Sequence, residues 1–370
     1  MTDGKHRHPA TVRLTSLVAL VVALGAAAVM LAAKPPAPAK PVSSTGGPAG
    51  ELTLEKAFPG KAAATVPAKV KDGARFSPLF FLDEKRSVGT AAGAGGASRL
   101  ILITPTGERE LRRLPKAEAP EFAGFAAQGQ RLVWMELTNT ADGIAHARLW
   151  TIDTEVAAPR MITADTGDVA LFDRSDDVAI HDAAISWVAA ARTDLPVTEI
   201  RTVPIAGGKV TVKTRSGAFA IASWPWLTSV NLGQDGPVEL VNAGTGQRVV
   251  VPVQANELMA CSPAWCRSVI IGSTAASTVI DILKPDGSQR TRVAAGDVAA
   301  SIVDVALLDR YEVYSYGTAK LTLYDLADRR SITVAKNVGQ VASRGPMLWW
   351  STGDKDTGVW HVLDLRGLAK

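Results

Sequence analysis

Hydrophobic and polar residues alternate along this chain in short runs, and the runs come in pairs that are joined by a turn. The clearest pair is Asp281–Val293, in which two alternating runs flank the turn sequence PDGS. Gly, Asp and Asn tolerate the positive φ of a tight hairpin, and alternation places every second side chain on one face of a sheet. The pattern therefore predicts a β-hairpin.

Similar hairpins recur at regular intervals. They are Leu100–Leu114, Leu149–Thr163, Glu199–Lys213, Val238–Val253, Leu321–Val334 and the unfinished Trp360–Lys370. A repeat of roughly 40 to 50 residues with four strands is typical of a β-propeller blade. The repeat therefore predicts an all-β fold with one closed propeller over residues 62–370, although a chain of 370 residues has room for more than one domain.

A second recurring unit lies between the hairpins and consists of an alternating strand, a short turn and a strand with a bulky residue. Trp134, Trp187, Tyr314 and Trp349 occupy comparable places in four copies. Large rings at matching strand positions favour packing between blades over a sugar-binding platform. Together the two units predict about seven four-stranded blades, with six as the alternative if the Gly-rich repeat Ala91–Ala97 is degenerate.

The last hairpin, Trp360–Lys370, has a first strand and a turn but no second strand. The stretch Ala63–Val70 has the opposite shape, because it resembles a second strand without a preceding partner. The simplest arrangement pairs Ala63–Val70 with Trp360–Leu365. This pairing closes the ring and removes exposed sheet edges, which otherwise invite aggregation.

The N-terminal region predicts a membrane anchor. The first 14 residues are polar and basic, and residues 15–33 follow, in which Ser16–Ala33 carry no charge and can cross a bilayer as one helix. Lys5, Arg7 and Arg13 precede this helix, so the remainder of the chain is expected outside the membrane. The alternative is a secretory signal that is cleaved at the A-x-A-like site Ala26–Ala28, which would release the protein.

Residues 34–61 are rich in Pro, Ala and Gly and predict a semi-extended linker between the membrane and the propeller. The net charge of +4 is concentrated before this point and within it, at Lys5, Arg7, Arg13, Lys34 and Lys40. A nearly neutral propeller offers no electrostatic attraction to phosphate backbones. Nucleic-acid binding is therefore excluded from the expected functions.

The only two cysteines, Cys261 and Cys266, flank a turn between the first two strands of one repeat. Facing positions of a hairpin are close enough for a disulfide, and an extracytoplasmic compartment would oxidise them. Metal binding and a redox pair are the alternatives, but no further Cys or His accompanies the two thiols. A disulfide is the prediction.

Motifs for catalysis or for a cofactor are missing from the sequence. No G-x-S-x-G occurs, and His146, His181 and His361 lie far apart without a surrounding motif. The stretch Gly353–Gly358 (GDKDTG) resembles part of a calcium loop but lacks the distal ligands, and Asp173–Asp177 (DRSDD) is interpreted as a solvated connection. No cofactor, no metal and no catalytic residue is predicted.

With its membrane segment, its repeats and the turn Pro285–Gly287 (PDG), the chain resembles the TolB-like or WD40-like propellers of bacterial envelopes. The Ala-, Val- and Arg-rich composition and the stretch Met259–Arg267 (MACSPAWCR) are similar to secreted TolB-like proteins of actinobacteria. The resemblance implies a role in envelope complexes. Two features depart from it: TolB-type repeats place S-P-D-G after the innermost strand and form six blades.

The sequence leaves two classes of function open. One is a binding or scaffold module for a protein or glycan of the cell envelope; the other is an envelope hydrolase or lyase with its site at the axial mouth of the propeller. Connections from second to third strands, and between blades, should emerge on one acid-rich face that would suit a cationic or hydroxyl-rich partner. The expected contact residues are Asp142, His146, Asp194, Asp354 and Asp356, with Asp165, Asp168, Asp235 and Asp297 on the same face.

Overall fold

The computed structural model describes residues 52–139, 145–155, 158–230, 237–272, 274, 277–317, 319–354 and 357–368. These residues belong to one compact unit. The predicted tail, membrane segment and first part of the linker lie outside the described residues. Within the described ranges, no helix is long and apolar enough to span a membrane.

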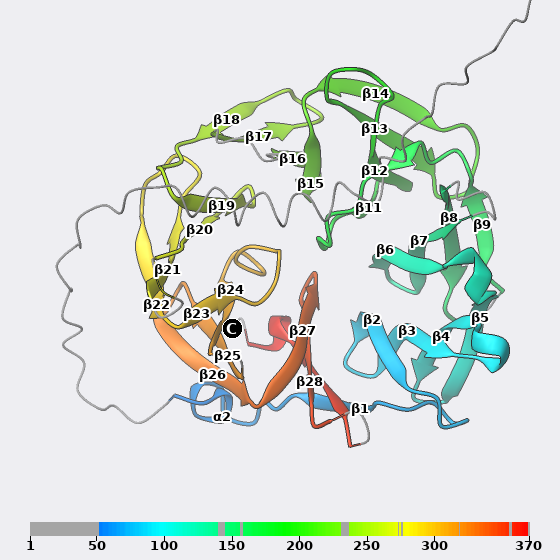
Figure 1. The fold of residues 1–370 in the computed structure, drawn as a ribbon, viewed down its shortest axis with the longest axis horizontal. Helices are drawn as coiled ribbons and strands as arrows, with labels where there is room; N and C mark the ends of the chain where they lie inside the picture. Colours follow the sequence, from blue (N-terminus) through cyan, green and yellow to red (C-terminus); the bar gives the residue numbers. More distant parts are fainter. Residues whose placement is uncertain are drawn as a thin grey trace, which may run out of the picture. The chain divides into compact units, whose positions relative to one another are not determined.

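The alternating runs of the sequence form antiparallel strands that assemble into seven separate sheets in the described part of the chain. The sheets follow one another around a ring, with β2, β6, β11, β15, β19 and β27 toward its centre (Figure 1). The chain is therefore an all-β propeller of seven blades, as the repeat predicts. The alternative of six blades is wrong.

Each of the first three blades takes its strands in chain order. Blade 1 contains β2 (Phe76–Asp83), β3 (Arg86–Ala92), β4 (Ser98–Thr104) and β5 (Gly107–Leu114), with the short 3-10 helix η1 (Ala94–Gly96) before β4 and η2 (Lys116–Glu118) after β5. Blade 2 contains β6 (Glu121–Gln128), β7 (Arg131–Asn139), β8 (Ala145–Asp153) and β9 (Arg160–Thr163). Blade 3 contains β10 (Asp168–Val169), β11 (Val178–His181), β12 (Ala184–Ala190), β13 (Val197–Pro204) and β14 (Thr211–Ser216).

Three of the remaining four blades are built in the same way. Blade 4 contains β15 (Phe219–Ser223), β16 (Trp226–Ser229), β17 (Val238–Asn242) and β18 (Arg248–Val251). Blade 5 contains β19 (Glu257–Cys261), β20 (Cys266–Ile270), β21 (Thr278–Leu283) and β22 (Thr291–Gly296). Blade 6 contains β23 (Val298–Ala300), β24 (Tyr311–Tyr316), β25 (Lys320–Asp325) and β26 (Arg330–Lys336).

Blade 7 combines both ends of the described chain. It contains β27 (Val338–Arg344), β28 (Met347–Thr352), β29 (Val359–Asp364) and β1 (Ala64–Pro67), and the 3-10 helix η4 (Leu365–Gly367) follows β29. Strand β1 pairs antiparallel with β29, with Thr65 opposite His361 and Val66 opposite Trp360. The Trp360 indole also donates a hydrogen bond to the Phe76 carbonyl of blade 1 at 3.0 Å.

Large side chains fill the spaces between neighbouring blades. Trp134 packs with residues of blades 1 and 2, Trp187 with blades 2 and 3, Tyr314 with blades 5 and 6, and Trp349 with blades 7 and 1. All four are buried. Burial of large aromatic rings is a major contribution to the free energy of folding, and the predicted packing role of these residues is confirmed.

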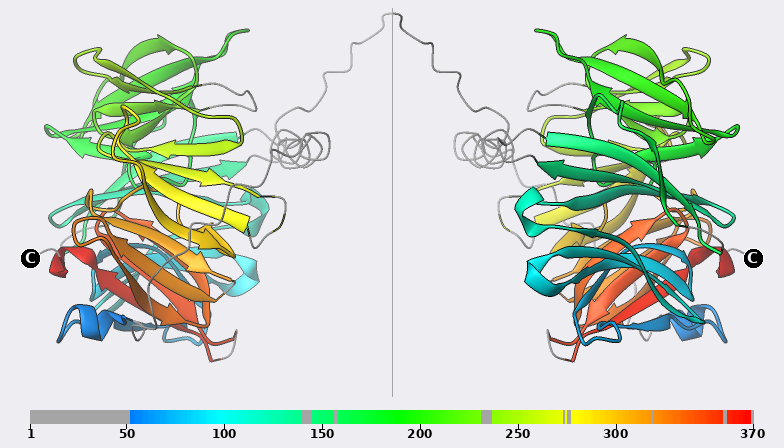
Figure 2. Two further views of the ribbon diagram at one scale, coloured as in Figure 1. Left: turned by 90° about the vertical axis from the view of Figure 1, so that its left-hand side faces the viewer. Right: turned by 90° about the vertical axis from the view of Figure 1, so that its right-hand side faces the viewer.

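The strand order gives the ring two faces. The A face carries the connections from second to third strands and from one blade to the next, such as 191–196 and 353–358. The B face carries the connections between first and second strands, such as 262–265 and 301–310, and between third and fourth strands. Helix η4 follows the third strand of blade 7 and lies at the B face, at the outer left edge of the left-hand view in Figure 2.

Part of the predicted linker is ordered. Residues 54–57 form the short helix α2 (Leu54–Ala57), and the Leu52 carbonyl accepts a hydrogen bond of 2.8 Å from the Thr333 amide of β26. Leu54 is buried in the core of blades 6 and 7, and Phe58 lies against it. Apolar side chains within an otherwise Pro- and Ala-rich stretch therefore attach residues 52–58 to the propeller.

Candidate functional site

The predicted contact residues lie on the A face, but they belong to different blades. His146 lies in β8 of blade 2, Asp194 in the connection 191–196 of blade 3, and Asp354 in the connection 353–358 of blade 7. All three are exposed. Asp142, Asp235 and Asp356 lie outside the described residues. The structure does not bring the three described side chains together into one site.

Two of the A-face acids already have partners within their own blade. The Asp165 carboxylate pairs with Arg201 at 2.7 Å, and Arg201 also pairs with Glu199 at 2.7 Å. The Asp354 carboxylate accepts hydrogen bonds from the Thr357 amide at 2.8 Å and the Thr357 hydroxyl at 3.0 Å. These carboxylates therefore shape the loops in which they lie.

Asp194 has a different setting, because it stands beside an exposed apolar residue. Leu195 is 76% exposed. The loop backbone is nevertheless fixed, since the Thr193 hydroxyl donates to the Leu195 carbonyl at 2.7 Å and the Ala191 amide donates to the Val197 carbonyl at 2.9 Å. A carboxylate and an apolar side chain are thus presented to solvent on a pre-ordered loop.

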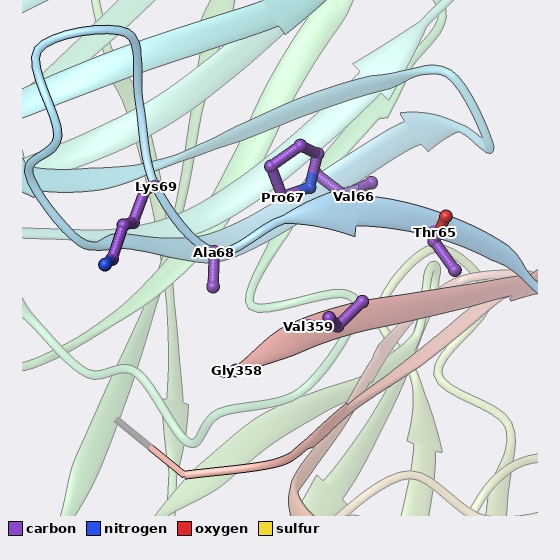
Figure 3. Close-up of a pocket in the computed structure, with 7 residues that line it drawn as sticks. All are labelled: Thr65, Val66, Pro67, Ala68, Lys69, Gly358 and Val359. Atoms are coloured by element: carbon purple, nitrogen blue, oxygen red, sulfur yellow. The ribbon is translucent and has the colours of Figure 1, made fainter. Parts of the chain in front are cut away.

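A shallow groove opens at the A-face end of blade 7, where β1 meets β29 (Figure 3). Its volume is about 420 Å³, within the range of small-molecule sites. Seven residues line it: Thr65, Val66, Pro67, Ala68, Lys69, Gly358 and Val359. Gly358 has no room for a side chain, because a Cβ there would lie 2.8 Å from the Asp354 carbonyl oxygen. The groove therefore adjoins the loop of Asp354.

The innermost strand of blade 3 is interrupted opposite the middle of β12. Strands β10 and β11 both pair with β12, and residues 170–177, here called the axial strap, leave the sheet between them. Leu171 packs into the core shared with blade 2, whereas Phe172 packs into the core shared with blade 4. Two apolar side chains thus anchor the strap, and its polar part is directed away from the sheet.

The polar part of the axial strap reaches blades on the other side of the ring. The Ser175 amide and hydroxyl both donate to the Asp304 carboxylate of blade 6, and the Gly345 amide of blade 7 donates to the Ser175 hydroxyl at 2.7 Å. Arg344 of blade 7 forms an ion pair with Asp173. Blade 3 is not a neighbour of blades 6 and 7, so these contacts cross the ring axis.

Figure 1 shows the segment before β11 directed to the ring centre, where the connection ahead of β24 and the tip of β27 also lie. The expectation of a solvated connection at Asp173–Asp177 is therefore wrong. The polar composition of this stretch resembles that of a turn, but its partners lie 129 to 171 residues away along the chain. A sequence pattern that extends over one repeat cannot report such contacts.

The connection that receives the strap is held by a buried ion pair. The Arg267 guanidinium of blade 5 pairs with Glu312 of blade 6 at 2.8 Å, and their side chains are 6% and 0% exposed. Arg267 also donates to the carbonyl oxygens of Ile302, Val303 and Asp304. Charge-assisted hydrogen bonds of this kind fix a loop strongly. The Asp304 carboxylate is therefore presented to the strap from a rigid support.

Two carboxyl groups of the strap have strongly shifted pKa values. Burial, and then the nearby Asp304 carboxylate, raise the pKa of Asp176 to about 6, although hydrogen bonds from Ser223 and Trp224 act in the opposite direction. Burial raises the pKa of Asp177 to about 6 against hydrogen bonds from the Phe172 and Arg174 amides. Groups with such shifts gather at functional sites and also at structural ion-pair networks.

His181 lies between Ser186 and Asp182, which is the order of groups in a Ser-His-Asp triad, but Ser186 is fully buried and a substrate cannot reach its hydroxyl. The His181 ring stacks on Trp224 at 4.3 Å, and its Nε2 lies 2.8 Å from the Ser186 hydroxyl. Ser186 is fully buried and also bonds to Thr202 at 2.7 Å. His361 bonds to Thr352 at 2.7 Å, and burial lowers the pKa of its ring. These contacts stabilise strands of blades 3 and 7.

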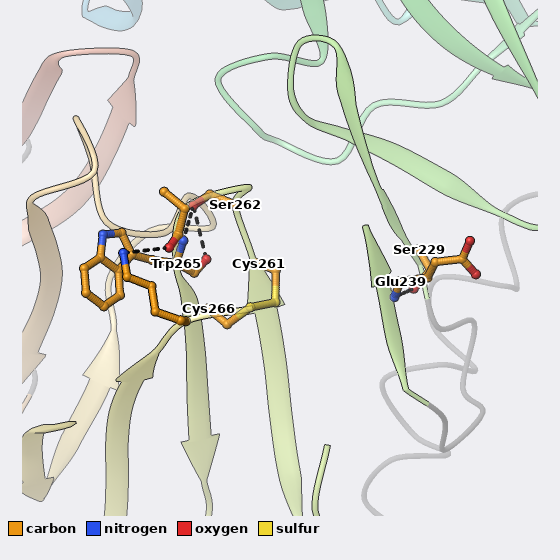
Figure 4. The surroundings of a disulfide bond; sticks show 8 residues. Ser229, Glu239, Cys261, Ser262, Trp265 and Cys266 are labelled. Atoms are coloured by element: carbon orange, nitrogen blue, oxygen red, sulfur yellow. Dashed lines mark hydrogen bonds between the residues drawn. A yellow bond between two sulfur atoms is a disulfide. The ribbon is translucent and has the colours of Figure 1, made fainter. Parts of the chain in front are cut away.

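The predicted disulfide is confirmed. Cys261 ends β19 and Cys266 begins β20, their Cα atoms are 4.1 Å apart, and both residues are buried (Figure 4). Within the turn, the Trp265 amide donates to the Ser262 hydroxyl at 3.1 Å. The Trp265 indole donates to the Asp309 carbonyl of blade 6 at 2.9 Å. The disulfide thus fixes a B-face turn that contacts the next blade.

The described residues contain no group of three or more His, Cys, Asp or Glu side chains that could hold a metal ion. Within the calcium-like stretch GDKDTG, Asp354 and Thr357 bond to each other, and residues 355 and 356 lie outside the described ranges. The arrangement of the described part is that of a turn.

No protein-family model matches the chain. No curated protein sequence matches it either. Solved structures do match. A puromycin-hydrolyzing peptidase of Mycobacterium tuberculosis aligns with a TM-score of 0.51 and 12% identity, over 85% of this chain and 55% of that chain. This chain therefore spans little more than half the length of that peptidase.

Two further matches have lower scores. The β-propeller domain of the Trilobed protease from Pyrococcus furiosus aligns with a TM-score of 0.46 and 11% identity, over 66% of this chain and 83% of that one. TolB from Acinetobacter baumannii aligns with a TM-score of 0.38 and 10% identity, over 77% of this chain and 62% of that one. At these identities the comparisons say nothing of function, and the propeller fold is shown by the seven sheets of the described residues themselves.

Proposed function

We propose that the protein is a membrane-anchored, extracytoplasmic binding module that recognises a protein or glycan of the cell envelope with its A face. The observation that carries the proposal is the axial strap, which crosses the ring at the B face. There, Asp173 of the strap pairs with Arg344, and Arg267 pairs with Glu312 beneath the connection that receives the strap. The side chains at the B-face end of the ring axis are therefore engaged in contacts within the protein.

The A face offers groups that can meet a partner. Asp194 and Leu195 are exposed on an ordered loop, and the groove of blade 7 presents the Thr65 hydroxyl and the Lys69 side chain at its edge (Figure 3). The Asp194 carboxylate suits a cationic partner, and the Thr65 hydroxyl and the Lys69 ammonium group suit a hydroxyl-rich one. The same face is where the sequence places the acidic loops.

The proposed location rests on two features. Residues 15–33 have the length and hydropathy of a single span, with basic residues before it. The disulfide Cys261–Cys266 supports an oxidising compartment, since disulfides are rare in the cytosol. The alternative location is secretion after cleavage near Ala28.

We also propose that the pairing of β1 with β29 holds the ring closed. Val66 and Trp360 are buried together with Phe76 and Phe81 of blade 1. The pairing therefore supplies blade 7 with an outer strand and joins the first and last blades through a shared core.

The proposal is tested by capture from solubilised cell envelopes, with the full-length protein in detergent as the bait. One variant changes four predicted A-face acids: Asp142→Asn, Asp194→Asn, Asp354→Asn and Asp356→Asn. A matched control changes four B-face acids by the same charge: Asp153→Asn, Asp182→Asn, Asp286→Asn and Asp309→Asn. Asparagine keeps the turn preferences of aspartate, so both variants should fold.

The expected result is loss of a specifically captured protein or glycan from the A-face variant and its retention by the B-face control. Thr65→Trp, which fills the groove from an exposed position of β1, distinguishes a ligand in the groove from one on the acidic loops alone. Capture that survives all A-face changes contradicts the face assignment.

The second candidate is an envelope hydrolase or lyase at the axial mouth. The raised pKa values of Asp176 and Asp177 favour it, because carboxyl groups that titrate near pH 6 can act as general acids. Turnover of a panel of ester, amide and glycoside substrates that disappears in Asp176→Asn would support this class and would replace the binding proposal.

A further inference from the structure

The axial strap is held at the ring centre by Asp304 of blade 6 and by Arg344 and Gly345 of blade 7. Asp304 of blade 6 receives the Ser175 amide and hydroxyl, and the Ser343 hydroxyl of blade 7 also donates to it at 3.5 Å. Any negative charge that the strap itself brings close to Asp304 opposes this docking. Asp176 brings such a charge to Asp304, whereas the Arg174 guanidinium of the strap is attracted to the same carboxylate.

Asp176 faces charged and polar groups of two other blades, blade 6 and blade 4. The Asp304 carboxylate lies across the axis, and the Ser223 hydroxyl and the Trp224 amide come from the turn between β15 and β16. His181, at the end of β11, stacks on Trp224 on the same side. When Asp176 is ionised, its carboxylate and that of Asp304 repel each other where the strap docks.

Asp177 is 2% exposed and lies inside the strap. Its carboxylate accepts the Phe172 amide at 2.9 Å and the Arg174 amide at 3.1 Å, and the Arg174 and Arg344 guanidinium groups lie nearby. Burial lowers the pKa of Arg174, which is likewise withdrawn from water. Burial outweighs these favourable contacts for Asp177, so its docked position also favours the protonated carboxyl.

We propose that the axial strap is a proton-controlled latch across the ring, which docks on blades 6 and 7 more tightly in mild acid than at neutral pH. Its release would open the B-face end of the ring. The latch concerns the B face and does not depend on which ligand the A face recognises.

The direction follows from the difference in proton binding. A released, solvated aspartate has a pKa near 3.8, whereas the docked Asp176 and Asp177 titrate at about 6. Between these values the docked strap binds more protons than the released strap, so docking strengthens as the pH falls through 6 toward 4. Above pH 7 both states are ionised, and the docking equilibrium reaches its weaker plateau.

The test is amide hydrogen exchange of the full-length protein in detergent, followed by mass spectrometry at pH 5, 6, 7 and 8. Exchange rates are divided by the intrinsic rate at each pH to give protection factors. The Ser175 amide, which donates to Asp304, reports strap release, and the amides of β12 report the stability of the blade. The expected gain in strap protection from pH 7 to pH 5 is about tenfold for each carboxyl that titrates.

Three variants and one control assign the effect. Asp176→Asn and Asp177→Asn are each expected to raise strap protection at pH 7 and to remove their own share of the pH dependence. Asp286→Asn, at an exposed aspartate of blade 5 whose carboxylate bonds to Ser288 within its own turn, should behave as the wild type. Ser175→Ala should lower strap protection at every pH and leave the dependence of strap protection on pH unchanged.

Strap protection that does not change with pH in the wild type would overturn the latch, even if neither asparagine variant folds. If strap protection depends on pH in both asparagine variants as it does in the wild type, the latch is also overturned. Loss of protection in β12 together with the strap would indicate opening of the whole blade and would contradict a local latch.

Discussion

At the scale of single residues, Arg267 is the side chain whose removal should be most costly. It neutralises the fully buried Glu312 and donates to three carbonyl groups of the connection 301–310. Removing one partner of a buried ion pair leaves an uncompensated charge, which typically costs about 3–5 kcal/mol. Arg267→Ala is therefore expected to lower the free energy of unfolding by that amount in urea titrations at pH 7.

Arg113→Ala is the matched control for this variant. Arg113 pairs with Glu110 at 2.7 Å, but its side chain is 46% exposed. Exposed ion pairs contribute about 0–1 kcal/mol. Equal destabilisation by the two substitutions would show that the buried pair has no special role, and the rigid support of the axial strap would then need another explanation.

Single residues also show the limits of sequence reasoning. The Cys261–Cys266 bond was predictable, because both cysteines flank one hairpin turn and need only local geometry. The Arg267–Glu312 pair was not predictable, because it joins side chains 45 residues apart that meet only when blades 5 and 6 pack together. Nothing in the alternation of either strand distinguishes these two charged residues from solvent-exposed ones.

At the scale of elements, β1 should determine whether the first and last blades stay joined. Val66 is 7% exposed and packs with Trp360 and Phe76, whereas Thr65 is an exposed neighbour on the same strand. Val66→Asp places a carboxylate in this core and is expected to destabilise the protein by several kcal/mol, on the order of 3. Hydrogen exchange should then speed up first in β29 and β28.

Thr65→Asp provides the control, because it introduces the same charge on the solvent side of β1. It should leave both the unfolding midpoint and the exchange of β29 close to those of the wild type. If Val66→Asp is no worse than Thr65→Asp, the proposal that β1 holds the ring closed is wrong.

Elements were predictable to the extent that their pattern is local. Alternation and turn residues predicted the hairpins, and the repeat predicted the blades. Blade 3 is the exception, because its inner strand divides into β10 and β11 around the axial strap. Leu171 and Phe172 continue the apolar pattern of a strand, although they serve the cores shared with two different neighbouring blades.

At the scale of the whole molecule, the blade number was predictable and the candidate site was not. The number follows from counting repeats, whereas a site depends on which side chains of distant blades converge. His146, Asp194 and Asp354 share a face, as the strand order requires, yet each lies on its own blade. Side chains of distant blades do meet at the axial strap, but the sequence of the strap has the composition of an ordinary loop.

The final prediction concerns how the molecule is placed in the cell. If residues 15–33 form an anchor with Lys5, Arg7 and Arg13 on the cytoplasmic side, protease added to intact spheroplasts should degrade the propeller and spare a cytoplasmic marker protein. The intact mass of the protein purified from membranes should equal the full chain less two hydrogen atoms, because Cys261 and Cys266 are joined. A mass that lacks the first 28 residues would instead identify a cleaved signal and a secreted propeller. If the propeller is fully protected in spheroplasts and is degraded only after lysis, the proposed orientation is wrong and the propeller lies in the cytoplasm.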